Sequence, residues 1–151
     1  MAGFLSLKIK NRFAGQKFPN KTKIERHHAE RFAFNLSFLT RDTKYNLEQT
    51  KTVTKKVRLK LLERMYQLSQ QDIVEVMNLR RDQGLERISE EQTRVSINPE
   101  FKSTKRYEEC DGDVFWVFRL GKQGRVLGKI NGNIFYILSI DATFDQYDHG
   151  S

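Results

Sequence analysis

The sequence has one cysteine and no long apolar run, and each scarcity excludes a class of protein. A single cysteine, Cys110, cannot support an intramolecular disulfide framework. The acidic residues beside it are expected to raise the pKa of its thiol, which argues against a reactive thiolate. No apolar stretch approaches the length that crosses a bilayer, and the one near the N-terminus is too short for a signal peptide. We therefore expect a cytoplasmic protein with no membrane partner.

The common catalytic and cofactor motifs are also missing. The sequence contains no Walker loop, no dinucleotide-binding glycine fingerprint, no nucleophile elbow and no zinc-ligand spacing. The adjacent residues His27 and His28 cannot share one helix face, and no second ligand cluster lies near them in the sequence. We therefore expect neither a metal site nor a cofactor.

Positive charge is what the sequence has in excess. The chain carries 27 Lys and Arg against 19 Asp and Glu, a net charge of +8. The simplest physical account is a polyanionic partner, RNA or DNA, although a merely soluble basic domain has the same composition. Residues 11–31 are polar and basic and are expected to form a mobile arm or long loop. The candidates in this arm for binding a nucleic-acid backbone are Lys17, Lys21, Lys23 and Arg26.

Hydrophobic periodicity predicts a single α+β domain. Alternating apolar residues predict strands at 5–9 and 32–38, and the second would bury Phe32, Phe34, Leu36 and Phe38 on one face. Apolar residues that recur at intervals of four, four, four and three positions predict an amphipathic helix over 49–68. Residues 69–72 resemble a capping box that would begin a second helix, and Gly84 would end that helix. Two helices joined by so short a connection are expected to form a hairpin. A short strand is expected at 94–97.

The C-terminal forty residues are the most informative part of the chain. Apolar-aromatic runs at 114–120, 125–130 and 134–140 are separated by glycine-containing breaks, and Asn131-Gly132 is a strong hairpin signal. These runs predict a three-stranded antiparallel meander, with a helical layer packed on one face of the sheet. Alternation puts Arg125 and Lys129 on one face of their strand. If the faces align, Arg119 joins them in one cationic patch.

This patch and the polar tail after it carry the candidate chemistry. Arginine holds phosphate bidentately, lysine holds it as a point charge, and both stabilise the charge that develops on phosphorus during RNA cleavage. Lys122, between the first two strands of the meander, is a further candidate for binding nucleic acid. In the tail, His149 suits a general base near neutral pH, and the Tyr147 phenol can transfer a proton if neighbouring cations lower its pKa. The non-catalytic alternatives are a solvated sheet face and an unstructured chain end.

A strand, a helix hairpin and a basic antiparallel meander with a late tyrosine resemble the RelE/ParE-like toxin superfamily of bacterial toxin–antitoxin systems. The resemblance covers residues 32–148 in layout, and the segment RVLGKINGNIFYILSIDATFDQY looks like the closing strands of that superfamily. In its ribonucleolytic branch, Arg and Lys hold the scissile phosphate on the ribosome, and a late Tyr or His moves protons. The resemblance implies these roles for Arg119, Arg125, Lys129 and Tyr147. The chain is longer than such toxins usually are and begins with an extra basic segment.

Three functions remain open from the sequence. The leading one is a toxin-like endoribonuclease that cleaves RNA without a metal ion, alone or on the ribosome, by attack of the 2′-hydroxyl on the adjacent phosphate. The second is a non-enzymatic nucleic-acid-binding protein of phage or mobile-element origin. The third is a protein-interaction module whose partner is an acidic antitoxin.

Overall fold

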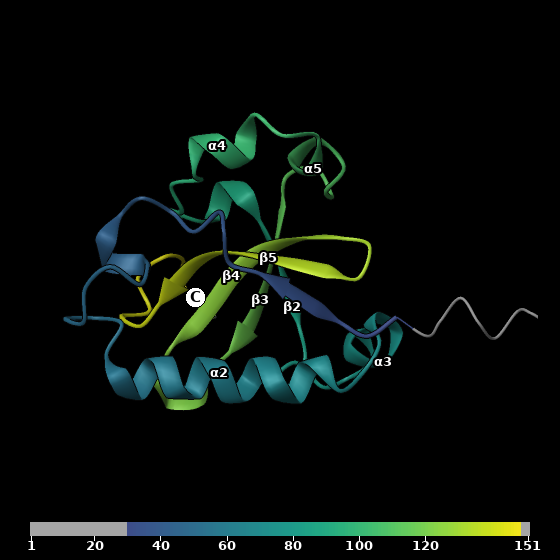
Figure 1. The fold of residues 1–151 in the computed structure, drawn as a ribbon, viewed down its shortest axis with the longest axis horizontal. Coiled ribbons are helices and arrows are strands. Elements are labelled where there is room, and N and C mark those ends of the chain that lie inside the picture. The colour runs from purple at the N-terminus through teal and green to yellow at the C-terminus, as the bar shows by residue number, and fades with distance from the viewer. Residues whose placement is uncertain (1–29, 149–151) are drawn as a thin grey trace, which may run out of the picture. The chain divides into compact units, whose positions relative to one another are not determined.

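The computed structural model describes residues 30–148, and the chain from Arg31 onward forms one compact unit. The fold is α+β, as predicted, with a five-stranded mixed sheet in the order β1-β5-β4-β3-β2 and helices on both sides of it (Figure 1). The strand predicted at 5–9 and most of the basic arm lie outside the described residues. Within the described range, no helix has the length and apolar character needed to cross a membrane.

The elements follow one another in a simple order. The strands are β1 (Ala33–Asn35), β2 (Glu86–Ser89), β3 (Val114–Arg119), β4 (Arg125–Asn131) and β5 (Ile134–Asp141). The α-helices are α2 (Lys55–Ser69), α3 (Ile73–Met77), α4 (Pro99–Lys102) and α5 (Lys105–Glu108). Short 3-10 turns occur at η2 (Thr43–Tyr45), η3 (Glu90–Gln92) and η4 (Gly121–Gln123).

The first strand is shorter than its alternating pattern predicts. β1 pairs with β5 in parallel and ends at Asn35, whose side-chain oxygen accepts a hydrogen bond from the Ser37 amide at 2.8 Å. Such a local turn competes with continued strand pairing. It leaves Leu36 exposed and places Phe38 in the apolar cluster on the opposite sheet face from Phe32. The prediction that one face of residues 32–38 is buried was therefore wrong beyond the turn.

The helix pair exists, but both of its starting points differ from the prediction. α2 begins at Lys55 because Thr54 caps it, its side chain accepting from the Val57 amide. The reciprocal capping box belongs to Asp72 and Glu75, three residues later than predicted. α3 is only five residues long and ends at Asn78, well before Gly84.

The C-terminal meander is confirmed. β3, β4 and β5 pair antiparallel, and Asn131 faces Ile134 across a tight loop in which Gly132 has φ 64°. A further antiparallel strand, β2, extends the meander beyond β3 and was not predicted. The strand predicted at 94–97 does not form. The residue before it, Thr93, makes only an isolated bridge to Tyr147.

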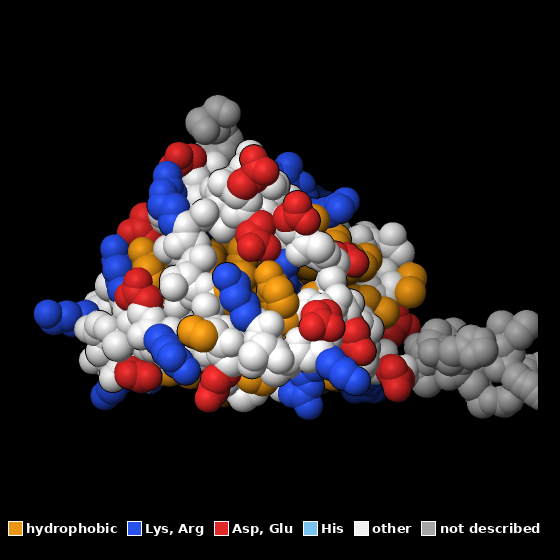
Figure 2. Space-filling model, turned by 90° about the horizontal axis from the view of Figure 1, so that it is seen from above, with side chains coloured by type: hydrophobic (Ala, Val, Ile, Leu, Met, Phe, Trp, Pro, Cys, Tyr) orange, Lys and Arg blue, Asp and Glu red, His pale blue; other side chains and the backbone are white. Residues whose placement is uncertain are grey.

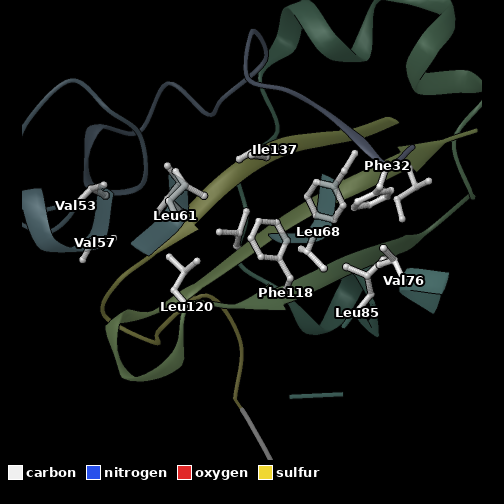
Figure 3. Close-up of a cluster of buried hydrophobic side chains, with 14 residues drawn as sticks. Phe32, Val53, Val57, Leu61, Leu68, Val76, Leu85, Phe118, Leu120 and Ile137 are labelled. Carbon is white, nitrogen blue, oxygen red and sulfur yellow. The ribbon is translucent and has the colours of Figure 1, made fainter. Parts of the chain in front are cut away.

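Each face of the sheet carries its own apolar cluster. On one face, the buried side of α2 packs against β3, β4 and β5, as Figure 3 shows for Leu61, Leu68, Phe118 and Ile137. The other face is covered from the side of α4 and α5, where Phe101 is fully buried against the strands. The sequence predicted helices on one face only, because no periodic signal marks the short helices of residues 90–112. The fold therefore has three layers.

Two adjacent leucines of α2 test this packing. Leu61 is buried against the sheet, whereas Leu62 is 64% exposed. Leu61→Ala should lower the free energy of unfolding by about 2–5 kcal/mol, because it leaves a cavity in the core. Leu62→Ala should change it by less than about 0.5 kcal/mol. Urea unfolding followed by circular dichroism measures both, and equal effects of the two substitutions would contradict the packing of α2.

Candidate functional site

The three predicted cations share one face of the sheet, but they do not form an exposed patch. Arg119 and Arg125 lie directly opposite each other on β3 and β4, and Lys129 follows on the same side of β4. This is the face covered by α4 and α5. Only 3% of Arg125 and 1% of Lys129 is exposed. The expectation of an open, solvated row of cations therefore fails for these two residues.

Lys129 is held by internal acceptors. Its ammonium donates to the carbonyl oxygens of Gly112 at 2.6 Å and Val114 at 3.0 Å, and it pairs with Glu90 at 3.2 Å. It also lies 5.2 Å from the ring centroid of Phe115. A buried ammonium satisfied in this way ties β4 to the start of β3 and to Glu90. The geometry supports a structural role for Lys129 rather than the phosphate contact that the resemblance implied.

Arg125 is the centre of a second buried network. Its Nε donates to the Asp141 carboxylate at 2.9 Å, and its Nη2 donates to the carbonyl oxygen of Tyr147 at 2.6 Å. The guanidinium carbon lies 3.6 Å from the centroid of the Tyr147 ring. Asp141, fully buried, also accepts from the backbone amides of Asp145 and Gln146. Arg125 and Asp141 thus fasten residues 141–148 onto the sheet.

Arg119 is more accessible and has a partner that sequence reasoning missed. Its Nε donates to Glu86 of β2 at 3.0 Å, and Glu86 also pairs with Arg81 at 2.9 Å. Burial raises the pKa of Glu86, but the hydrogen bonds from Arg119 and Arg81 outweigh burial, so its pKa is lowered overall. Glu86 is therefore ionised at neutral pH. Because β2 has no clear periodic pattern, nothing in the sequence marked this carboxylate.

Tyr147 lies beside these groups and is buried, with an exposed fraction of 4%. Burial raises the pKa of its phenol, and the nearby Arg125 and Arg119 offset this only in part. The condition that the sequence set for proton transfer, a Tyr147 pKa lowered by neighbouring cations, is therefore not met, because burial outweighs their effect. The phenol stays protonated at neutral pH and is therefore suited to donate a hydrogen bond or a proton rather than to accept one.

The four side chains meet at one end of the sheet, and we call Glu86, Arg119, Arg125 and Tyr147 the sheet-end site. Two hollows open on either side of Tyr147. One, of about 180 Å³, is lined by Arg119, Gly121, Arg125, Phe144 and Tyr147. The other, of about 390 Å³, is lined by Arg81, Glu86, Arg87, Ile88, Gln92, Tyr147 and Asp148. Only Arg119 of the four is partly accessible, with 34% of its side chain exposed, whereas Glu86, Arg125 and Tyr147 line the hollows as largely buried groups.

The other predicted site residues do not join this group. Lys122 of η4 lines a separate groove of about 380 Å³ between η4 and α2, together with Lys56 and Lys60. His149 and the four arm cations Lys17, Lys21, Lys23 and Arg26 lie outside the described residues. Among the residues the structure describes, no group of His, Cys, Asp and Glu is placed to hold a metal ion. Cys110 is buried, which raises the pKa of its thiol to about 11, and Asp111 and Glu109 add to the rise.

Most of the charge excess belongs to residues that the structure does not describe. Of the 27 Lys and Arg, seven fall in residues 1–29 with a single acid, Glu25, which leaves 20 cations and 18 acids in residues 30–148. On the side of the molecule where α4 and α5 lie, acidic and basic side chains are interspersed (Figure 2). Most of the net charge that suggests a polyanionic partner therefore belongs to the first 29 residues.

No family model, curated protein or solved structure matches the chain.

The Arg125–Asp141 pair makes a direct prediction about the site. Asp141→Asn should lower the free energy of unfolding by about 3–5 kcal/mol, because it leaves the buried Arg125 charge without a counterion. It should also speed amide hydrogen exchange in residues 142–148. Asp148→Asn is the matched control, since the Asp148 side chain is 75% exposed and pairs with Arg94 on the surface. Equal stability of the two variants would show that the buried pair does not hold the tail.

Proposed function

We propose that the chain is a toxin-like endoribonuclease that cleaves RNA at the sheet-end site. The observation that carries this proposal is the convergence of Glu86, Arg119, Arg125 and Tyr147 around two adjoining hollows. A carboxylate, two guanidinium groups and a protonated phenol are the groups that a phosphate transesterification needs. The proposal also draws on the resemblance to RelE/ParE-like toxins that the sequence suggests, through its order of strand, helix pair and antiparallel meander.

In the proposed reaction, the 2′-hydroxyl of the RNA attacks the adjacent phosphorus while the bond from phosphorus to the 5′-oxygen breaks. The Glu86 carboxylate takes the proton of the 2′-hydroxyl, and the Tyr147 phenol gives a proton to the departing 5′-oxygen. Arg119 and Arg125 stabilise the negative charge that develops on the phosphate oxygens. The products are a 2′,3′-cyclic phosphate and a 5′-hydroxyl. A proton transfer from Glu86 to Tyr147 restores the starting state.

The pairing of Glu86 with Arg119 explains how a carboxylate of lowered pKa becomes a base. Without substrate, Arg119 and Arg81 hold the pKa of Glu86 down. A bound phosphate competes for Arg119 and draws its guanidinium away from the carboxylate. The pKa of Glu86 then rises toward the range in which a carboxylate accepts a proton more readily. Substrate binding therefore activates the base.

A second candidate function is a non-enzymatic nucleic-acid-binding protein. Two observations favour it: Arg125 and Lys129 are engaged in internal contacts, and seven of the chain's cations lie in residues 1–29. In this alternative, the N-terminal segment supplies phosphate contacts through counterion release, and the sheet-end site is structural. The two functions differ in whether bound RNA is cut.

Substitution of the two proton-transfer groups separates the candidates. Tyr147→Phe and Glu86→Gln should each lower the rate of RNA cleavage by about a hundredfold to ten-thousandfold and leave RNA binding largely unchanged. Matched controls are Tyr66→Phe and Glu63→Gln, which alter exposed side chains of α2. The assay uses a mixed RNA pool with and without ribosomes, and thermal unfolding checks that each variant is folded. A wild-type chain that binds RNA but leaves it intact in both conditions establishes the binding protein instead.

The pH dependence of cleavage gives a further test. Glu86 must be ionised and its pKa lies below its usual 4.5, whereas Tyr147 must be protonated and its pKa lies above its usual 10.0. The cleavage rate should therefore stay level across neutral pH, fall on the acidic side as Glu86 becomes protonated, and fall on the alkaline side as Tyr147 loses its proton. In the residual activity, Glu86→Gln should remove the acidic fall and Tyr147→Phe the alkaline one. A rate that changes steeply between pH 6 and 8, the range in which histidine titrates, contradicts these assignments.

A further inference from the structure

Phe144 has a backbone conformation that folding alone does not favour for phenylalanine. Among residues 30–148 it is the only non-glycine residue with positive φ, at 61°. A bulky L-residue in the left-handed region is strained, and glycine or asparagine would adopt this conformation more readily. The ring also gains little from burial, because the residue is 48% exposed. An exposed aromatic ring on a strained residue points to a functional rather than a packing role.

The turn that presents Phe144 is held firmly. The buried Asp141 carboxylate accepts from the Asp145 amide at 3.2 Å and from the Gln146 amide at 3.0 Å, on the far side of Phe144. The Thr143 hydroxyl approaches the same carboxylate at 3.4 Å. The guanidinium of Arg125 lies 5.4 Å from the centroid of the Phe144 ring. The backbone on both sides of Phe144 is therefore held, and its ring lies beside the sheet-end site.

Phe144 stands between two hollows of different chemistry. On one side it lines the hollow of about 180 Å³ that holds Arg119 and Arg125. On its other side lies a hollow of about 430 Å³ whose remaining lining residues are mostly carboxylates and other polar groups: Asp42, Tyr45, Arg94, Asp145, Gln146 and Asp148. Two of its three carboxylates are paired with cations, Asp145 with Lys44 at 2.7 Å and Asp148 with Arg94 at 3.1 Å, so the second hollow has no excess of positive charge to hold a phosphate. Carboxylate and amide oxygens can also accept hydrogen bonds from the amino and imino groups of a nucleobase. A nucleotide thus fits with its phosphate toward the arginines and its base toward Phe144.

We propose that Phe144 is a stacking platform for one unpaired nucleobase next to the phosphate that the sheet-end site holds. This assignment rests on the proposed function and names its substrate class as single-stranded RNA or an RNA loop. A base within a duplex is already stacked and paired, so its face is not available to the ring. Because an aromatic side chain can stack with any base, the platform distinguishes single-stranded from double-stranded RNA rather than one base sequence from another.

The test measures RNA binding separately from cleavage. The probe is a mixed-sequence single-stranded RNA with 2′-O-methyl groups, which cannot be cleaved by 2′-hydroxyl attack, compared with the same strand in a duplex. Binding is measured with the full chain at about 0.15 M salt, where contacts due to charge alone are weakened. Phe144→Leu should lower affinity for the single strand by about fivefold to a hundredfold and leave duplex affinity unchanged. Phe144→Trp should preserve single-strand affinity.

Two further variants distinguish a platform from a structural residue. Phe144→Gly relieves the positive φ, so it should lose single-strand affinity while its Tm stays the same or rises. Tyr66→Leu removes an exposed ring of α2 and should change neither affinity nor stability. A Phe144→Leu variant that binds the single strand as tightly as wild type overturns the platform, as does a wild-type chain that fails to bind single-stranded RNA.

Cleavage of unmodified RNA keeps the two proposals apart. If wild type cleaves RNA and Phe144→Leu retains full single-strand affinity, the platform is wrong and the proposed activity stands. If wild type leaves RNA intact but Phe144→Leu loses single-strand affinity alone, the proposed activity is wrong and the platform stands.

Discussion

A buried ion pair between Arg125 and Asp141 organises the end of the sheet at which the candidate site lies. The two residues face each other across β4 and β5, and burial of both charges is costly unless every remaining donor and acceptor is satisfied. The additional partners all come from the segment after β5: the amides of Asp145 and Gln146 and the carbonyl oxygen of Tyr147. The contacts that compensate the buried charges are therefore the contacts that place the Tyr147 phenol.

The basic residues of the chain divide by burial into different roles. Lys129 is enclosed by carbonyl oxygens and ties the start of β3 in place, and Arg125 fastens the C-terminal segment. Arg119 is partly accessible and shares Glu86 with Arg81, so a phosphate can compete for it. The seven cations of residues 1–29 supply most of the net charge. A net charge of +8 thus suggests a polyanionic partner without indicating which cations meet it.

Residues 90–112 determine what the sheet-end site can contact. The short helices α4 and α5 lie over one sheet face and bury Phe101 against it, which closes that face to solvent over much of its length. The two hollows of the sheet-end site lie at the end of the sheet, both of them beside Tyr147. If the proposed activity resides here, the site would have room for one phosphate and its neighbouring nucleotides rather than for a long groove of backbone contacts.

The sequence by itself determined the elements whose signals are local. The spacing of Val57, Leu61 and Leu68 predicted α2, and the glycine-containing breaks predicted the meander, because helix period and turn chemistry act over a few residues. Tertiary structure alone decided the burial of Lys129 and the meeting of Glu86 with Arg119, which are 33 residues apart. Alternation along a strand tells which face a side chain occupies. It does not tell what covers that face or which strand pairs at its edge, because those depend on contacts between segments far apart in the chain.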